Sequence, residues 1–233
     1  MRYFVSDIHG EMGLLLQLLD RIGFGPADEL FVCGDMLDKG PHSVTLLKFI
    51  FSHPNIHCIQ GNHEWQFLQY YHSLLRASPT DFDGVLTALR AYFQTDGHLL
   101  DWDTVDALEA LPYYIEESDF ICVHAGAPLS PDGHLLPLHT ATPQQLVNDR
   151  RFKDPAVLPA NAPCIFFGHT PTAYLCGRNE ILIYPRRPSR APAQITDLYK
   201  VHLDTGTFLG GVLGCYCAED GTACYVQKKG PKT

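Results

Sequence analysis

The order of apolar and amphipathic segments in the first third of the chain is the feature that most restricts its fold. Short apolar runs at residues 3–6, 30–33 and 56–60 alternate with helix-like stretches at residues 10–22, 43–51 and 64–75. Short apolar runs are typical of buried strands, whereas leucines spaced three and four residues apart are typical of helices. This β-α-β-α-β-α order predicts parallel strands joined by right-handed helical crossovers.

The remainder of the chain carries a second group of predicted elements. Residues 79–110 are expected to be helical, mainly over 82–93 and 103–111. Strand patterns follow at residues 113–115, 120–123, 164–167, 181–184, 200–203, 207–213 and 223–227. Turn sequences at residues 204–206 and 220–221 predict that the last three strands form antiparallel hairpins. The length of 233 residues predicts one domain over residues 1–227 and a flexible tail over residues 228–233.

Charge and cysteine usage exclude several classes of protein. The net charge of −9 argues against nucleic-acid binding, which needs lysine and arginine against phosphates. No run approaches the roughly 20 apolar residues of a membrane span, and the first residues lack a secretory pattern. The cysteines at positions 33, 58, 122 and 164 lie in strand-like runs, where thiols are usually buried. We therefore expect a cytoplasmic protein in a reducing compartment, with no membrane or nucleic-acid partner.

Five short polar motifs are the strongest functional signal in the sequence. They are Asp7–Gly10, Gly34–Gly40, Gly61–Glu64, Val123–Gly126 and Gly168–Thr170. Each motif ends a predicted strand, and ligands bind at the carboxyl ends of strands in open α/β sheets. The Asp, Asn and His side chains of these motifs suit manganese, iron or zinc. Two such cations held close together can activate water and stabilise a phosphoryl group, so the motifs predict a phosphoester hydrolase.

Taken together, the five motifs resemble the phosphoprotein phosphatase family within the calcineurin-like metallophosphoesterases, in its compact bacterial and phage form. The resemblance covers about residues 1–170 and extends more weakly through residues 202–206. It implies an α/β fold in which a β-sandwich of mixed sheets is flanked by helices. It also implies an active site at the carboxyl-terminal ends of the strands.

The resemblance implies a role for each motif residue. The implied metal ligands are Asp7 and His9 for one cation, Asn62, His124 and His169 for the other, and Asp35 as the bridging carboxylate. The implied general acid is His63, which Asp38 orients, and the implied nucleophile is a hydroxide that bridges the metals. A histidine paired with a carboxylate is a natural proton donor near neutral pH. The cofactors are expected to be two divalent ions, manganese first, with iron or zinc as alternatives.

The resemblance also implies contacts to the substrate phosphate, and here the sequence departs from the family pattern. The implied contacts come from Asn62, Lys39 and at least one of Arg150 and Arg151, with Arg151 favoured. Family members usually carry Arg where this chain has Lys39, and a lysine lacks the bidentate fork that grips phosphate. The stretch at residues 146–152 also lacks the Trp that small bacterial members often have before their phosphate-binding Arg.

Three functions are compatible with these motifs. The leading prediction is a protein serine/threonine phosphatase that acts on phosphorylated proteins or peptides. The first alternative is a diadenosine tetraphosphate-type hydrolase of dinucleoside polyphosphates, a class that replaces the Asp equivalent to Asp38 and places Trp after the last His, where this chain has Thr170. The second alternative is a scaffold without catalysis, and the retention of His63 and all six ligand positions argues against it.

Overall fold

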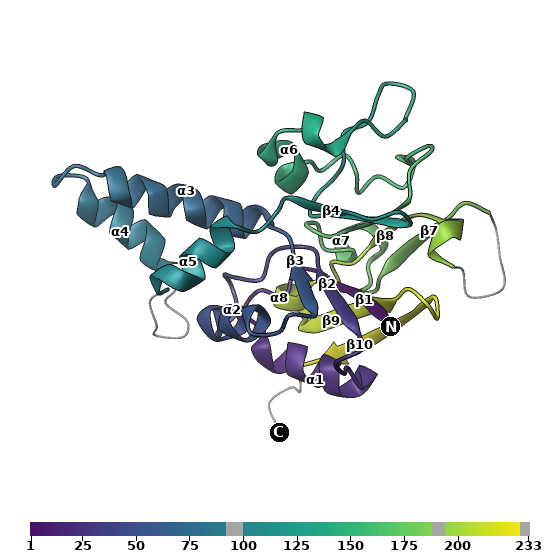
Figure 1. The fold of residues 1–233 in the computed structure, drawn as a ribbon, viewed down its shortest axis with the longest axis horizontal. Coiled ribbons are helices and arrows are strands. Elements are labelled where there is room, and N and C mark those ends of the chain that lie inside the picture. Colours follow the sequence, from purple (N-terminus) through teal and green to yellow (C-terminus); the bar gives the residue numbers. More distant parts are fainter. Residues whose placement is uncertain (92–99, 188–193, 229–233) are drawn as a thin grey trace.

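The computed structural model describes residues 1–91, 100–187 and 194–228, which form two stacked five-stranded sheets with helices outside them (Figure 1). The first sheet has the order β10-β9-β1-β2-β3, and the second has the order β4-β5-β6-β8-β7. The first contains β1 (Arg2–Val5), β2 (Glu29–Val32), β3 (Ile56–Cys58), β9 (Val212–Cys217) and β10 (Thr222–Gln227). The second contains β4 (Tyr114–Glu116), β5 (Phe120–Val123), β6 (Cys164–Phe167), β7 (Leu182–Pro185) and β8 (Leu198–His202).

Both sheets combine parallel and antiparallel strands. Strands β1, β2 and β3 pair in parallel, as the β-α-β-α-β-α order predicts. In the second sheet β5, β6 and β8 pair in parallel, and the antiparallel strands β4 and β7 close its edges. The predicted class of an α/β sandwich of mixed sheets is therefore confirmed.

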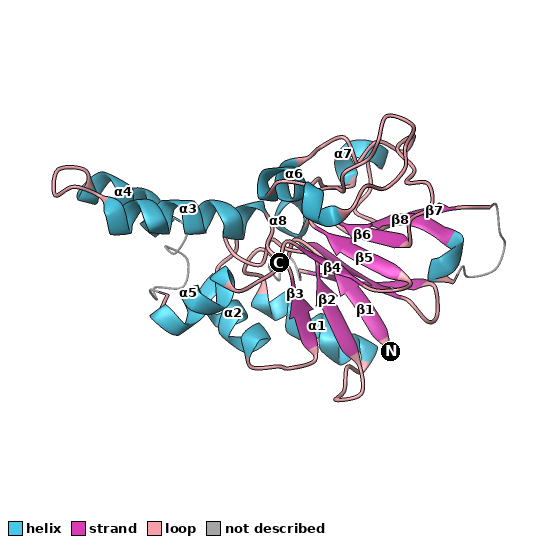
Figure 2. Cartoon of the chain, turned by 45° about the horizontal axis from the view of Figure 1, so that its top comes forward, coloured by secondary structure: helices cyan, strands magenta, loops and turns pink. Residues whose placement is uncertain are grey.

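Helices complete the fold. They are α1 (Met12–Ile22), α2 (Ser43–Phe51), α3 (Asn62–Arg76), α4 (Phe82–Ala91), α5 (Trp102–Glu109), α6 (Pro143–Asn148), α7 (Ala173–Cys176) and α8 (Thr207–Gly210), with 3-10 turns at Leu138–Thr140 and Ile195–Asp197. Figures 1 and 2 show α3 and α4 lying side by side and projecting away from the sheets. The predicted helix over residues 82–93 is present as far as residue 91, and residues 92–99 lie outside the described part of the chain.

Aromatic side chains from both sheets fill the space between them. The rings of Phe4 and Phe166 stack with centroids 3.6 Å apart, and Phe120 meets Phe4 edge-on at 5.0 Å. Successive residues of a strand point to opposite faces, so Tyr3 and Val5 instead pack among the helices on the outer side of the first sheet. Burial on both faces explains why these strands read as continuous apolar runs.

Two predictions about residues 200–213 are wrong. The stretch predicted as a strand over residues 207–213 forms α8 and only the start of β9, because Gly206 and Gly211 adopt left-handed backbone angles that interrupt an extended chain. The predicted hairpin between residues 200–203 and 207–213 is also absent, since β8 pairs in the second sheet and β9 in the first. The hairpin of β9 and β10 around Asp220-Gly221 is confirmed.

Two further predictions concern the C-terminal tail and the cysteines. Lys228 is the last described residue and pairs with Glu11, and the rest of the predicted tail lies outside the described residues. The four cysteines in strand-like runs are buried, as predicted, and all eight are free thiols. Among the helices of the described ranges, none is long and apolar enough to span a bilayer.

Candidate metal centre

The loops after β1, β2, β3, β5 and β6 bring the polar motifs together. His9 Nε2 lies 3.7 Å from Asp35 Oδ2 and 3.9 Å from Asp7 Oδ1. On the other side, His124 Nε2 lies 3.4 Å from Asp35 Oδ1. All of these side chains are buried, although they come from distant parts of the chain.

Asn62 completes the second half of this cluster. Its Oδ1 atom lies 3.0 Å from His124 Nε2 and 2.8 Å from His169 Nδ1. All six residues that the sequence predicts as metal ligands are thus brought together around Asp35.

The donor atoms suit a pair of cations. Within the described residues, two groups have ligand atoms within 4.8 Å of one another: His9, Asp35 and His63, and Asp35, His124 and His169. Asp35 belongs to both groups, as expected of a carboxylate shared by neighbouring metals. His169 Nε2 is buried and has no hydrogen-bond partner among the described residues, so one donor remains available.

Two of the imidazole rings are oriented for coordination by backbone carbonyls. His9 Nδ1 donates to the Leu37 carbonyl at 3.1 Å, and His124 Nδ1 donates to the Cys33 carbonyl at 2.8 Å. A carbonyl only accepts, so the hydrogen sits on Nδ1 and Nε2 of each ring points into the cluster. Metal-binding histidines commonly donate their second nitrogen in this way.

Backbone strain is concentrated in the cluster. Seven non-glycine residues have positive φ in the described chain, and six belong to the predicted site: Asp7, His9, Asp35, Asp38, Lys39 and His169. This left-handed region is unfavourable for residues with a Cβ and is often found where function requires it. Glycines let the loops approach, since a Cβ on Gly61 would lie 2.2 Å from Asp35 Oδ1 and one on Gly168 would lie 2.1 Å from Asp7 Oδ2.

The charges in the cluster are strongly coupled. Burial raises the pKa of Asp35, yet His124 and His63 together hold it well below its usual range. Conversely, the carboxylates of Asp35 and Asp7 outweigh burial and raise the pKa of His124 to about 10, so a cation bound by this ring would have to displace the proton on Nε2. Burial lowers the pKa of His9 to about 4, which keeps that ring neutral as a ligand requires.

His63 and Asp38 form a pair at the edge of the cluster. His63 Nδ1 lies 2.7 Å from Asp38 Oδ2, and His63 Nε2 lies 3.7 Å from Asp35 Oδ2. Burial lowers the pKa of His63, but Asp35 and Asp38 outweigh it and the pKa is raised overall. A histidine kept protonated by a carboxylate can donate a proton to a leaving oxygen. The arrangement also places His63 among the possible metal donors, a location the sequence does not predict.

Lys39 reaches the cluster beside His9. Its Nζ atom lies 3.3 Å from His9 Nε2 and 4.3 Å from the ring centroid of Phe208. Phe208 lies in α8, within the chain crossing at residues 203–211, and also meets His9 edge-on, with ring centroids 5.9 Å apart. This ammonium is therefore held where it can meet an anion bound next to the metal ligands.

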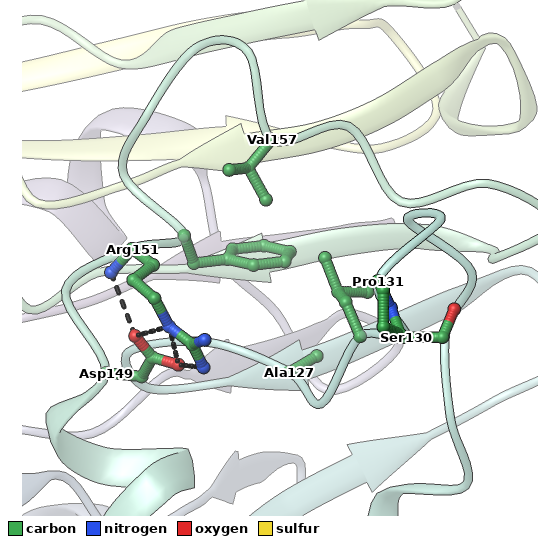
Figure 3. A pocket seen from close by; sticks show the side chains of 8 residues that line it. Ala127, Ser130, Pro131, Asp149, Arg151 and Val157 are labelled. Carbon is green, nitrogen blue, oxygen red and sulfur yellow. Dashed lines mark hydrogen bonds and ion pairs between the residues drawn. The ribbon is translucent and has the colours of Figure 1, made fainter.

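The two arginines lie differently in the structure. Arg151 pairs with Asp149 through Nη2 and Oδ2 at 2.6 Å, and its side chain is 80% exposed (Figure 3). Burial lowers the pKa of His169 to about 3, and the charges of His124 and Arg150 contribute to the shift, which puts Arg150 within electrostatic range of the cluster. The preference for Arg151 as the phosphate contact stays a prediction.

Glu64 is the main residue of the site that the sequence interpretation did not assign. It is fully buried, and its two carboxylate oxygens accept hydrogen bonds from the backbone N–H groups of Asp35, Met36, Leu37 and Gly61. One side chain thus joins the loop after β2 to the start of α3. A glutamate three residues after Gly61 at a helix start is a capping-box spacing, which was the available signal.

We expect Glu64→Gln to destabilise the metal-free protein. An amide group replaces one acceptor oxygen and leaves backbone donors unpaired, each at a cost of about 1–3 kcal/mol. Urea unfolding monitored by circular dichroism should show a lower free energy of unfolding. The matched control is Glu116→Gln, an exposed carboxylate on β4 that should leave stability unchanged. Equal stability of Glu64→Gln and wild type would contradict the linking role.

Curated relatives match about half of the chain. The chain is 33% identical over 130 residues to a symmetrical bis(5'-nucleosyl)-tetraphosphatase of Pseudomonas putida strain F1, covering 54% of this chain and 42% of that protein. A protein of the same name from Ectopseudomonas mendocina is 34% identical over 128 residues, covering 54% and 44%. The chain thus spans less than half the length of these curated relatives.

Solved structures share the fold across almost the whole chain. A metallophosphoesterase from Sphaerobacter thermophilus aligns with a TM-score of 0.61 and 16% identity, covering 98% of this chain and 88% of that one. A structure provisionally described as a diadenosine tetraphosphatase aligns with a TM-score of 0.68 and 19% identity, covering 99% and 94%. The family model for calcineurin-like phosphoesterases matches residues 3–197. The chain therefore belongs to the calcineurin-like phosphoesterase family.

Proposed function

We propose that the chain is a metal-dependent hydrolase of dinucleoside polyphosphates. The observation that carries this proposal is the single carboxylate, Asp35, that joins two groups of possible metal ligands. The choice of substrate is supported by the tetraphosphatases that match 54% of the chain. These matches favour the first alternative from the sequence analysis, a hydrolase of dinucleoside polyphosphates, over a protein phosphatase.

The proposed cofactors are two divalent cations, with manganese, iron or zinc suited to the imidazole and carboxylate donors. His9, Asp7 and Asp35 would hold one, and Asp35, Asn62, His124 and His169 the other. When bound, the cations supply Lewis acidity toward the phosphoryl oxygens. The chain's own residues then provide positive charge, orientation and a proton.

The proposed reaction consumes one water for each bond broken. The water oxygen joins one phosphorus and releases a proton to solvent, the bridging P–O bond breaks, and the leaving oxygen takes a proton from His63, which solvent then reprotonates. Asp38 holds the imidazole of His63 in place at 2.7 Å. Lys39 contributes positive charge to a substrate that is itself strongly anionic. Symmetrical cleavage of a dinucleoside tetraphosphate would release two nucleoside diphosphates.

The pairing of His63 with Asp38 supports a second candidate, the hydrolysis of phosphoserine or phosphothreonine in proteins. A serine or threonine alkoxide is a much stronger base than a nucleoside diphosphate, so it depends more on a proton donor as it leaves. A well-positioned general acid therefore has most to contribute with such substrates. Phosphorylated proteins or peptides are the partners of this second proposal.

A substrate panel on the metal-reconstituted protein tests both candidates. We expect kcat/KM for diadenosine tetraphosphate to exceed that for a phosphoserine peptide by at least about tenfold, a difference of roughly 1.4 kcal/mol in the transition state. Chelation should abolish turnover of both substrates. The reverse preference would establish the protein phosphatase, and bound metal without turnover of any phosphoester would establish a scaffold.

A further inference from the structure

A pocket of about 300 Å³ opens beside the metal ligands. It is lined by Ala127, Leu129, Ser130, Pro131, Asp149, Arg151, Phe152 and Val157 (Figure 3). Ala127 follows His124 by three residues, so their Cα atoms are at most about 11 Å apart. A Cβ on Gly126 would lie 2.9 Å from Phe152, so this part of the loop packs directly against the pocket wall.

The lining combines an apolar interior with a polar rim. Leu129, Phe152 and Val157 supply the apolar surface, whereas Asp149 and Arg151 lie at one side of the opening (Figure 3). The guanidinium of Arg151 is neutralised by Asp149, with Nε 3.0 Å from Oδ1 and Nη2 2.6 Å from Oδ2. A carboxylate at the rim repels phosphate, so the pocket suits an uncharged, flat group with polar edges.

The wall of the pocket that contains Phe152 is held in place by Lys200 and Phe167. The ammonium of Lys200 is buried and donates to the carbonyls of Phe152 and Asp154, both at 2.7 Å. The ring of Phe152 also packs edge-on against Phe167 with centroids 5.0 Å apart. A lysine inside a buried strand is unusual because burial disfavours its charge. A wall fixed in this way needs little ordering when a ligand binds.

The opposite wall is tied down by backbone pairing. Leu129 bridges to Leu135, and His134 bridges to Ala160, which joins the loop at residues 128–135 to the loop at residues 153–160. Ala160 N donates to the Gly133 carbonyl at 2.9 Å. Both loops that form the pocket are thus fixed to each other before any ligand arrives.

We propose that this pocket binds one nucleoside of a dinucleoside polyphosphate, with the base against Leu129 and Val157 and its polar edge toward Asp149 and Arg151. This inference rests on the proposed function, because it assigns a place to the nucleoside of that substrate. The guanidinium plane of Arg151 can stack on a base, and the carboxylate of Asp149 can accept from an amino or hydroxyl group. In a symmetrical cleavage two phosphates separate this nucleoside from the broken bond.

The test fills the pocket with Val157→Trp and compares it with Leu158→Trp, which introduces the same side chain at the adjacent exposed position that does not line the pocket. We expect Val157→Trp to raise KM for diadenosine tetraphosphate, relative to KM for p-nitrophenyl phosphate, by about tenfold, equal to a loss of roughly 1.4 kcal/mol in binding. Leu158→Trp should behave as wild type with both substrates.

Inhibition of p-nitrophenyl phosphate hydrolysis separates this inference from the proposed function. Wild type should be inhibited more strongly by ADP than by inorganic pyrophosphate, and Val157→Trp should remove that preference. Wild type that prefers ADP but does not cleave diadenosine tetraphosphate would support the pocket and refute the proposed reaction. Cleavage with no change in KM or ADP preference in Val157→Trp would overturn the pocket assignment, as would a rise in KM confined to phosphopeptides.

Discussion

Asp35→Asn should remove metal binding and activity together. Asp35 is shared by both groups of possible ligands, with Oδ2 3.7 Å from His9 Nε2 and Oδ1 3.4 Å from His124 Nε2. An amide carries no charge and offers one oxygen where the carboxylate offers two. Lewis acidity is worth several kcal/mol, so we expect kcat/KM to fall by at least about a thousandfold.

Metal content must be measured alongside activity for this variant. Elemental analysis after dialysis against manganese should show both cations lost from Asp35→Asn, and calorimetric titration should show no tight binding. Asp106→Asn, at an exposed carboxylate on α5, is the matched control and should retain wild-type metal content and activity. A variant of Asp35 that keeps two metals per chain would refute the shared ligand.

His63→Asn should slow turnover while leaving metal binding intact. His63 pairs with Asp38 at 2.7 Å, and these neighbouring carboxylates raise its pKa above the ordinary value despite burial. Removal of a general acid typically costs about 10²–10⁴-fold in rate. The loss should be largest for substrates with strongly basic leaving groups and smallest for an activated aryl phosphate. A series of aryl phosphates with increasing leaving-group pKa measures this dependence directly.

The same variant decides between two roles that the geometry allows for His63. The Nε2 atom lies 3.7 Å from Asp35 Oδ2, within a group of possible metal donors. If His63→Asn loses a cation, His63 is a ligand and not an acid. If both cations remain and the rate loss is the same for every leaving group, proton donation is also excluded. Asp38→Asn should reproduce the leaving-group dependence with a smaller loss, because the imidazole stays but its orientation weakens.

The elements that the sequence predicted well are those with a strong local pattern. The helix over Ser43–Phe51 and the strands over Phe120–Val123 and Cys164–Phe167 have the predicted bounds, since apolar spacing and flanking turns specify them locally. Residues 207–213 were predicted wrongly because their apolar content also suits a strand. There, the left-handed angles of Gly206 and Gly211 decide the path, and composition alone does not reveal them.

The position of a residue in the sequence does not reveal which distant residues it contacts in the folded chain. Lys200 reads as an ordinary strand residue, yet it holds the carbonyls of Phe152 and Asp154 from 46 to 48 positions away. Similarly, the sequence assigns Arg151 to the substrate phosphate and gives no role to Asp149, and only the folded loops place both residues at the rim of a pocket with Val157. The contacts of Lys200 follow from the order of strands in the second sheet, which brings β8 next to the loop that carries Phe152 and Asp154.

The sequence by itself determined the alternation of strands and helices, the class of fold and the set of Asp, Asn and His side chains at the ends of strands. It did so because burial and turn formation act on neighbouring residues, and because those side chains have few chemical uses in such positions. The tertiary structure decided how the chain crosses between the sheets after β8, how Glu64 joins two loops, and where the pocket beside His124 opens. Those features depend on contacts between residues far apart in the chain, which no local pattern encodes.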